Sequence, residues 1–191
     1  MRQTVRRVSG YLRRFAVAQQ AAAAIEFAFV FPIMLLLYVG VAEGGAMITV
    51  DRKVQSVAGA IGDLVARSNE TLQRGTLTDY FRAGGIIMTP YSSAPLVQRV
   101  MLVEVRTDLS TEVEWCQQYA NGVMTGCSIY PDGSSFTLPD DLVSLASGQS
   151  VVVAEAGYSY TPIARLILTQ PMSLFRRNFY MPRFGGTIEL R

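Results

Sequence analysis

The 191-residue chain contains no histidine, the commonest general base and the most frequent zinc ligand. It has a single lysine, Lys53, and it lacks both a glycine-rich phosphate loop and a nucleophile elbow. Three aspartates, Asp132, Asp140 and Asp141, do not have the alternating spacing of a calcium loop. The sequence therefore predicts neither an enzyme nor a metal or other cofactor site, and no small-molecule substrate.

Basic charge is concentrated at the N-terminus. The first 25 residues include five arginines and no acid, whereas residues 51–191 carry twelve basic and thirteen acidic side chains. The positive-inside rule predicts that the arginines stay in the cytoplasm and that the C-terminal part is exported. Because the net charge of +2 comes from this tail alone, it does not indicate a nucleic-acid partner.

The longest hydrophobic run begins after this tail. Sixteen uncharged residues separate Glu26 from Glu43, enough with the flanking small and apolar residues for one helix across a bilayer. We expect a cytoplasmic leader over 1–21, a transmembrane helix over 22–50 and a periplasmic or extracellular head over 51–191, held in a bacterial inner membrane.

The two glutamates at the ends of the run allow two interpretations. Either both flank the hydrocarbon and reach water, or Glu26 has a role inside the membrane that offsets its desolvation, roughly 2.5 to 3.5 kcal/mol at a helix centre. Pro32 is tolerated in a spanning helix, and Gly40 and Gly44 form a Gly-xxx-Gly pair that lets another helix approach. The alternative for these two glycines is that they simply face lipid.

The stretch AAAAIEFAFVFPIMLLLYVGVAEGG resembles the leader and helix of TadE-like minor pilins of the tight adherence (Tad or Flp) pilus, a type IV pilin-like system. The resemblance lies in the basic leader, the small residues, Glu26-Phe27, Pro32 and Gly40, while Ala21 stands where the family usually has glycine. Tyr158-Ser159-Tyr160-Thr161-Pro162 and a closing strand over 183–188 resemble the family's head more loosely.

The resemblance implies a pilin pathway. A prepilin peptidase would cut between Ala21 and Ala22, so that Glu26 becomes the fifth residue and pairs with the free amine of a neighbouring subunit. The partners would be this peptidase, other pilins and pilus-assembly membrane proteins. The implied function is that of a minor pilin or pseudopilin in filament assembly, priming or capping, and so in adhesion.

Two alternatives remain open at this stage. One is a secretory signal cut near Ala42, Gly44 or Ala46. The other is a single-pass inner-membrane protein with a periplasmic ligand-binding or sensor domain and a passive anchor. The glutamate inside the apolar region and the helical pattern that continues after it favour the pilin interpretation.

The rest of the chain predicts an α+β head. Apolar residues at helical spacing over 51–68 predict that the helix continues beyond the membrane. We expect a helical turn over 78–82 closed by Gly84 and Gly85, and extended strands at four places, over 86–89, 98–106, 112–119 and 150–160. The predicted architecture is a small antiparallel sheet packed on the outer half of the long helix.

Finer expectations concern three parts of this head. Cys116 and Cys127 bracket an Asn-Gly turn, and a structural disulfide suits them better than a metal or redox pair. In the strand over 112–119, alternation places Val113, Trp115 and Gln117 on one face. Residues 163–184 mix apolar, aromatic and arginine residues, which predicts a packed sheet edge with solvated arginines rather than a nucleic-acid or membrane surface.

Overall fold

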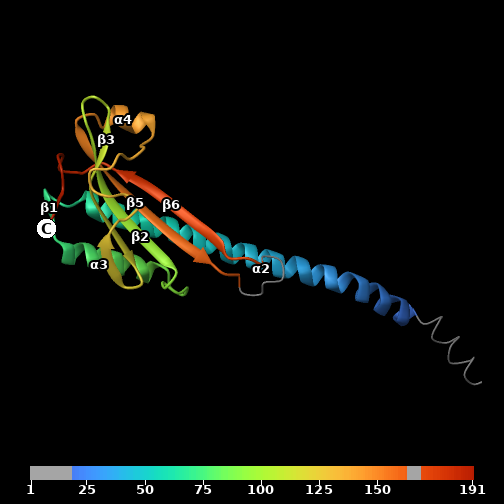
Figure 1. Ribbon diagram of the computed structural model, residues 1–191. Coiled ribbons are helices and arrows are strands. Elements are labelled where there is room, and N and C mark those ends of the chain that lie inside the picture. Colours follow the sequence, from blue (N-terminus) through green and yellow to red (C-terminus); the bar gives the residue numbers. More distant parts are fainter. Residues whose placement is uncertain (1–18, 163–168) are drawn as a thin grey trace, which may run out of the picture.

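The computed structural model describes residues 19–162 and 169–191 (Figure 1). The predicted leader, apart from its last three residues, and residues 163–168 lie outside the described residues. One helix, α2 (Gln19–Ala66), runs without interruption from the apolar stretch into the head and contains Pro32. The expected continuation of the helix beyond residue 50 is confirmed.

The head follows in the order β1-α3-β2-β3-β4-α4-β5-β6-β7. Its helices and strands are α3 (Arg74–Ile87), α4 (Asp140–Leu145), β1 (Thr71–Leu72), β2 (Leu96–Val105), β3 (Thr111–Ala120), β4 (Val123–Gly126), β5 (Gln149–Tyr160), β6 (Met172–Tyr180) and β7 (Glu189–Leu190). Five strands form one antiparallel sheet in the order β4-β3-β2-β5-β6, while β1 and β7 form a separate parallel pair.

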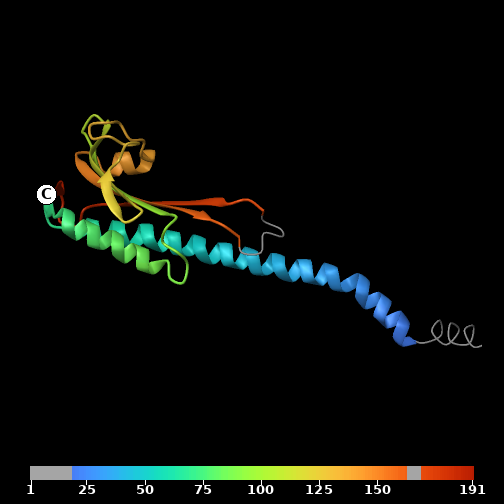
Figure 2. The ribbon, with the colours of Figure 1, turned by 60° about the horizontal axis from the view of Figure 1, so that its bottom comes forward.

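The sheet lies along the outer half of α2, with α3 beside that helix and α4 over the opposite face (Figure 2). The helix-side core includes Val54, Val57 and Ile61 of α2, each no more than 1% exposed. The opposite core joins Val103 and Val151 of the sheet to the segment that carries α4. The fold is therefore α+β, as the sequence predicted, and the predicted apolar face of α2 is the one that packs.

Of the two elements predicted near α3, one is confirmed and one is wrong. The expected helical turn over 78–82 lies within a fourteen-residue helix, although Gly84 and Gly85 do not close it. The strand expected over 86–89 does not exist, because α3 continues through these glycines to Ile87. Gly84 sits where a Cβ atom would lie only 2.2 Å from Gln98 Oε1 and 2.9 Å from Ile61 Cδ1. This glycine permits close helix packing here and does not end the helix.

A β-bulge corrects the expected faces of β3. Leu102 pairs with Trp115 but Val103 pairs with Val113, so Glu114 is the extra residue on β3. An extra residue reverses the alternation of side chains beyond it. Val113 consequently lies in the core opposite to that of Trp115, and the prediction that they share a face is wrong.

The C-terminal segment also differs from expectation. Residues 183–188, expected as a closing strand, form a turn in which Gly185 and Gly186 have φ of 71° and 76°, and the strand follows at β7. A full edge strand, β6, precedes this turn and pairs only with β5 in the described sheet. Its Arg176 is paired with Asp51 of α2, which agrees with a packed edge bearing arginines.

Candidate functional site

The N-terminal part of α2 lies outside the head and contacts none of its described elements over several turns (Figure 1). Every residue from Ala22 to Tyr38 is exposed, including Phe27, Phe29 and Phe31, which are 64%, 74% and 48% exposed. The helix is long and apolar enough to cross a membrane. A bare apolar helix of this length is unfavourable in water, so the segment requires lipid or other helices around it.

Glu26 lies on this bare segment. The Phe27 ring next to it contacts that of Phe31 one turn later, with centroids 5.3 Å apart. No described cation forms an ion pair with Glu26, which is exposed. The bond between Ala21 and Ala22 is also part of α2, close to its described start. The head therefore leaves the Glu26 carboxylate accessible to partners.

Small residues shape the surface of α2 nearer to the head. Around Gly40 there is an apolar depression of about 410 Å³, whose lining also includes Ile33 and Leu37. A Cβ atom on Gly44, one turn further on, would meet no atom within 4 Å. Pro32 lies inside the helix on the bare segment. The residues predicted to favour close helix packing thus face open space.

Glu43 differs from Glu26. It is only 6% exposed, so the interpretation in which it simply reaches water is wrong. Burial raises the pKa of Tyr160 at the end of β5, and the charges of Tyr91 and Glu43 add to this effect. The head therefore packs on α2 from Glu43 onward, seven residues before the boundary expected from hydropathy at residue 50.

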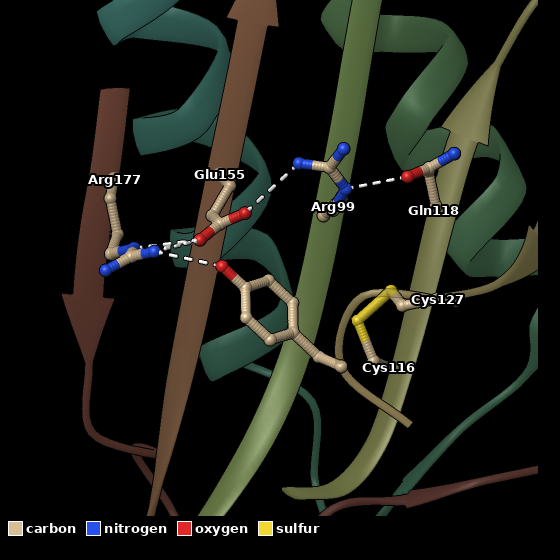
Figure 3. Close-up of polar contacts among 7 residues, drawn as sticks. Arg99, Cys116, Gln118, Cys127, Glu155 and Arg177 are labelled. Carbon is tan, nitrogen blue, oxygen red and sulfur yellow. Dashed lines mark hydrogen bonds and ion pairs between the residues drawn. A yellow bond between two sulfur atoms is a disulfide. The ribbon is translucent and has the colours of Figure 1, made fainter. Parts of the chain in front are cut away.

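A charged row crosses the face of the sheet that does not meet α2 (Figure 3). Glu155 of β5 is 1% exposed and lies between Arg177 of β6 and Arg99 of β2, with N–O distances of 2.6 and 3.4 Å. Arg99 also donates to Gln118 of β3 at 2.6 Å, and Arg177 to the Tyr130 hydroxyl at 3.2 Å. The buried carboxylate is fully paired, which indicates a structural role across four strands.

Sequence reasoning missed both Glu155 and the burial of Glu43. A signal for Glu155 was present, because it is the only charge in the apolar run VVVAEAG, and such a charge within a strand requires a partner. Its partners lie on strands far apart in the sequence, so the charged row could not be predicted from the sequence. Glu43 carried no comparable signal.

The two cysteines are joined in a disulfide with a Cα–Cα distance of 5.4 Å (Figure 3). It links the second half of β3 to the residue after β4 and encloses the hairpin turn, where Asn121 and Gly122 have φ of 52° and 81°. Asp132 accepts a hydrogen bond from the Cys116 N–H at 3.2 Å, and Asp140 and Asp141 lie in the first turn of α4, as predicted.

Comparison with known proteins gives one match. No curated protein matches the chain, and no solved structure matches it. Residues 21–61 match the family model described as TadE-like protein. The matched residues run from the proposed cleavage position to the middle of the contact between α2 and the sheet. TadE-like proteins are pilus components rather than enzymes. The match confirms the resemblance seen in the sequence: the chain carries a TadE-like N-terminal region, which associates it with the Tad pilus.

Proposed function

We propose that this chain is a minor pilin or pseudopilin of a Tad (type IVb-like) pilus, taking part in filament assembly, priming or capping and so in surface adhesion. The observation that carries the proposal is the bare apolar segment of α2 within the TadE-like region, which continues into the folded head as one uninterrupted helix. A subunit built in this way presents one helix to its neighbours and holds its head at a defined distance from them.

Processing by a prepilin peptidase between Ala21 and Ala22 would leave Glu26 four residues from a new amine. At 1.5 Å per residue that separation is about 6 Å along the helix. The amine of one subunit then reaches the Glu26 carboxylate of a neighbour after an axial shift of about one turn. The attraction offsets the desolvation of the carboxylate and sets the register between helices.

Packing between helices is the second part of the proposal. Gly40 and Gly44 lie one turn apart on the same side of α2, and the depression around Gly40 accepts a side chain from a partner helix. Pro32 removes one backbone hydrogen bond from the spanning segment, which a neighbouring helix compensates. The expected neighbours are other pilins and pilus-assembly membrane proteins.

We propose a single-pass topology with the arginine-rich leader in the cytoplasm and the head in the periplasm, from where the subunit enters an extracellular filament. The bilayer would hold the bare part of the predicted segment 22–50, since the last two turns of that segment contact the head. A passive anchor for a periplasmic sensor accounts less well for the TadE-like region, since such an anchor needs no acid within its apolar stretch.

The test is Glu26→Ala in the native strain, with Glu189→Ala, an exposed carboxylate on β7, as the matched control. We expect the first variant to accumulate with a folded head but to lower the number of pili, while the control assembles normally. Fluorescence of the single tryptophan, Trp115, reports the folding of the head. Normal piliation in the Glu26 variant would contradict the proposed role.

N-terminal sequencing of protein purified from membranes tests the processing step separately. An N-terminus at Ala22 is the expected result. An uncut chain would refute cleavage, and a start near Met47 would refute the membrane-held subunit altogether.

A further inference from the structure

A cleft of about 690 Å³ opens on the head, away from the exposed half of α2. It lies between the C-terminal half of α3, the segment 88–95 and the turn between β3 and β4. Its volume falls within the range of about 300–1,000 Å³ that small-molecule sites occupy. Neither the charged row nor the disulfide is part of its lining.

The cleft contains an aromatic platform. Tyr119 stacks on the buried Phe81, with ring centroids 5.5 Å apart and an interplanar angle of 12°. Gln98, also in the lining, is 2% exposed, and its Oε1 is buried against Gly84 of α3, where a Cβ atom would lie 2.2 Å from it, so this oxygen is closed to a ligand. The apolar surface that a ligand meets is therefore the Tyr119 ring, and the polar groups that it meets are those of the rim.

The rim is polar and nearly uncharged. Thr89, Ser92, Ser93 and Asn121 supply hydroxyl and amide groups, and Arg82 is the one charged residue among the described lining. The carbonyl end of the α3 dipole faces this region, which disfavours an anion. With no described carboxylate in the lining, a cation gains no ion pair either. The electrostatics select a neutral ligand.

The rim is also held in place before any ligand binds. Lys53 of α2 donates to the carbonyls of Ile87 and Thr89 at 2.9 and 2.8 Å, and the Tyr158 hydroxyl donates to the Ser92 carbonyl at 3.0 Å. These bonds tie the segment after α3 to the helix and to β5. A fixed rim lowers the entropy lost on binding.

We propose that this cleft binds a neutral saccharide. The sugar hydroxyls exchange hydrogen bonds with the rim hydroxyls and the Asn121 amide, and the C–H face of the ring packs on Tyr119. A saccharide matches the mixed lining because it combines many neutral hydrogen-bonding groups with an apolar ring face. The argument depends on contacts within the head and is independent of the pilus assignment.

The experiment uses the full chain in micelles of a detergent without a sugar head group. Glucose, galactose, N-acetylglucosamine and lactose are titrated by saturation-transfer NMR, with sialic acid and glucosamine as charged probes. We expect at least one neutral sugar to bind saturably, with a Kd of about 1 mM or lower. If no neutral sugar saturates, or only a charged probe does, the proposal is refuted.

Gly85→Leu places a side chain in the cleft at little cost, since a Cβ at Gly85 meets only Ser93, at 3.7 Å or more. Gly75→Leu on the same helix is the matched control, with nothing within 4 Å and no part in the lining. We expect at least a tenfold loss of affinity for Gly85→Leu and none for Gly75→Leu. Trp115 fluorescence verifies that each variant is folded. Equal affinity in both would overturn the proposed location.

Discussion

The contact between α2 and the sheet depends on Gly62, and Gly62→Ala tests this directly. A Cβ atom at this position would lie 2.5 Å from Tyr180 Cε2 and 2.9 Å from Ala154 Cβ. The Tyr180 ring cannot swing away freely, because its hydroxyl donates to the Gly59 carbonyl at 3.0 Å. Ala154 belongs to β5 in the middle of the sheet, so relief requires α2 to move away from the sheet.

The expected cost follows from two opposing effects. Overpacking a tight core costs typically about 1–3 kcal/mol. Three contacts shorter than 3 Å, two to the Tyr180 ring and one to Ala154 Cβ, favour the upper end. Replacing a helical glycine by alanine returns about 1 kcal/mol. The net loss is about 2 kcal/mol, or about thirtyfold in the folding equilibrium. For a chain of this size the melting temperature should fall by about 4–8 °C.

The assay is thermal and urea unfolding in detergent micelles, followed by Trp115 fluorescence. This residue is the only tryptophan, is 7% exposed and donates to the Ile188 carbonyl at 2.7 Å, so its emission reports the tertiary contacts of the head. Gly75→Ala is the matched control, because nothing lies within 4 Å of a Cβ there. It should leave stability unchanged or raise it.

Two results would refute this reasoning. If Gly62→Ala is as stable as Gly75→Ala, the close approach of α2 to the sheet is absent. If the loss is present but Tyr180→Ala does not reduce it, the tyrosine ring is not what opposes the new methyl group. A double-mutant cycle of Gly62→Ala and Tyr180→Ala measures this coupling.

Three further predictions concern bonds within the head. Removing the Cys116–Cys127 disulfide should lower the free energy of unfolding by about 3 kcal/mol, as expected for a closed loop of this length, and neither thiol of exported protein should react with a label before reduction. Glu155→Gln should cost about 3 kcal/mol in urea unfolding, because it leaves two partly buried arginines without a counter-charge, whereas Glu104→Gln at an exposed pair should cost less than about 1 kcal/mol. The Arg67 hydrogen bond lowers the pKa of Asp63 below its ordinary 3.8, desolvation opposes this shift, and a hydrogen bond from Arg183 lowers the pKa further. The stability that Asp63 contributes is therefore present above about pH 4 and lost as pH falls through its lower folded-state pKa, so the difference between wild type and Asp63→Asn should vanish in acid.

Helix α2 supplies both the bare apolar segment and part of the head's core, which has a consequence for assembly. The helix is bare from Ala22 to Tyr38 and packed against the sheet from Glu43, so only a short stretch around Gly40 separates the two environments. In the proposed filament, a neighbouring subunit that packs on the bare part would act on a helix whose continuation forms one wall of the head's core. The helix itself would then set the position of the head relative to the filament axis.

Much of this protein follows from local pattern. The length of the apolar run and its flanking charges predicted a helix that is long and apolar enough to cross a membrane. The spacing of Glu26, Pro32 and Gly40 gave the resemblance to TadE-like proteins. Apolar periodicity likewise predicted the continuation of α2 and the strands β2, β3 and β5, because a single helix face or strand face is encoded by neighbouring residues. The Asn121-Gly122 turn between the cysteines was likewise predictable from neighbouring residues alone.

Other features were decided only when distant segments met. Gly84 and Gly85 act as helix breakers in isolation, yet α3 continues through both. The lack of a side chain at Gly84 allows close contact with α2 and Gln98. The bulge at Glu114 depends on pairing with β2, and the burial of Glu43 on packing against the head. The row around Glu155 and the cleft above Gln98 combine residues from several elements, and such arrangements arise from tertiary packing that no local pattern encodes.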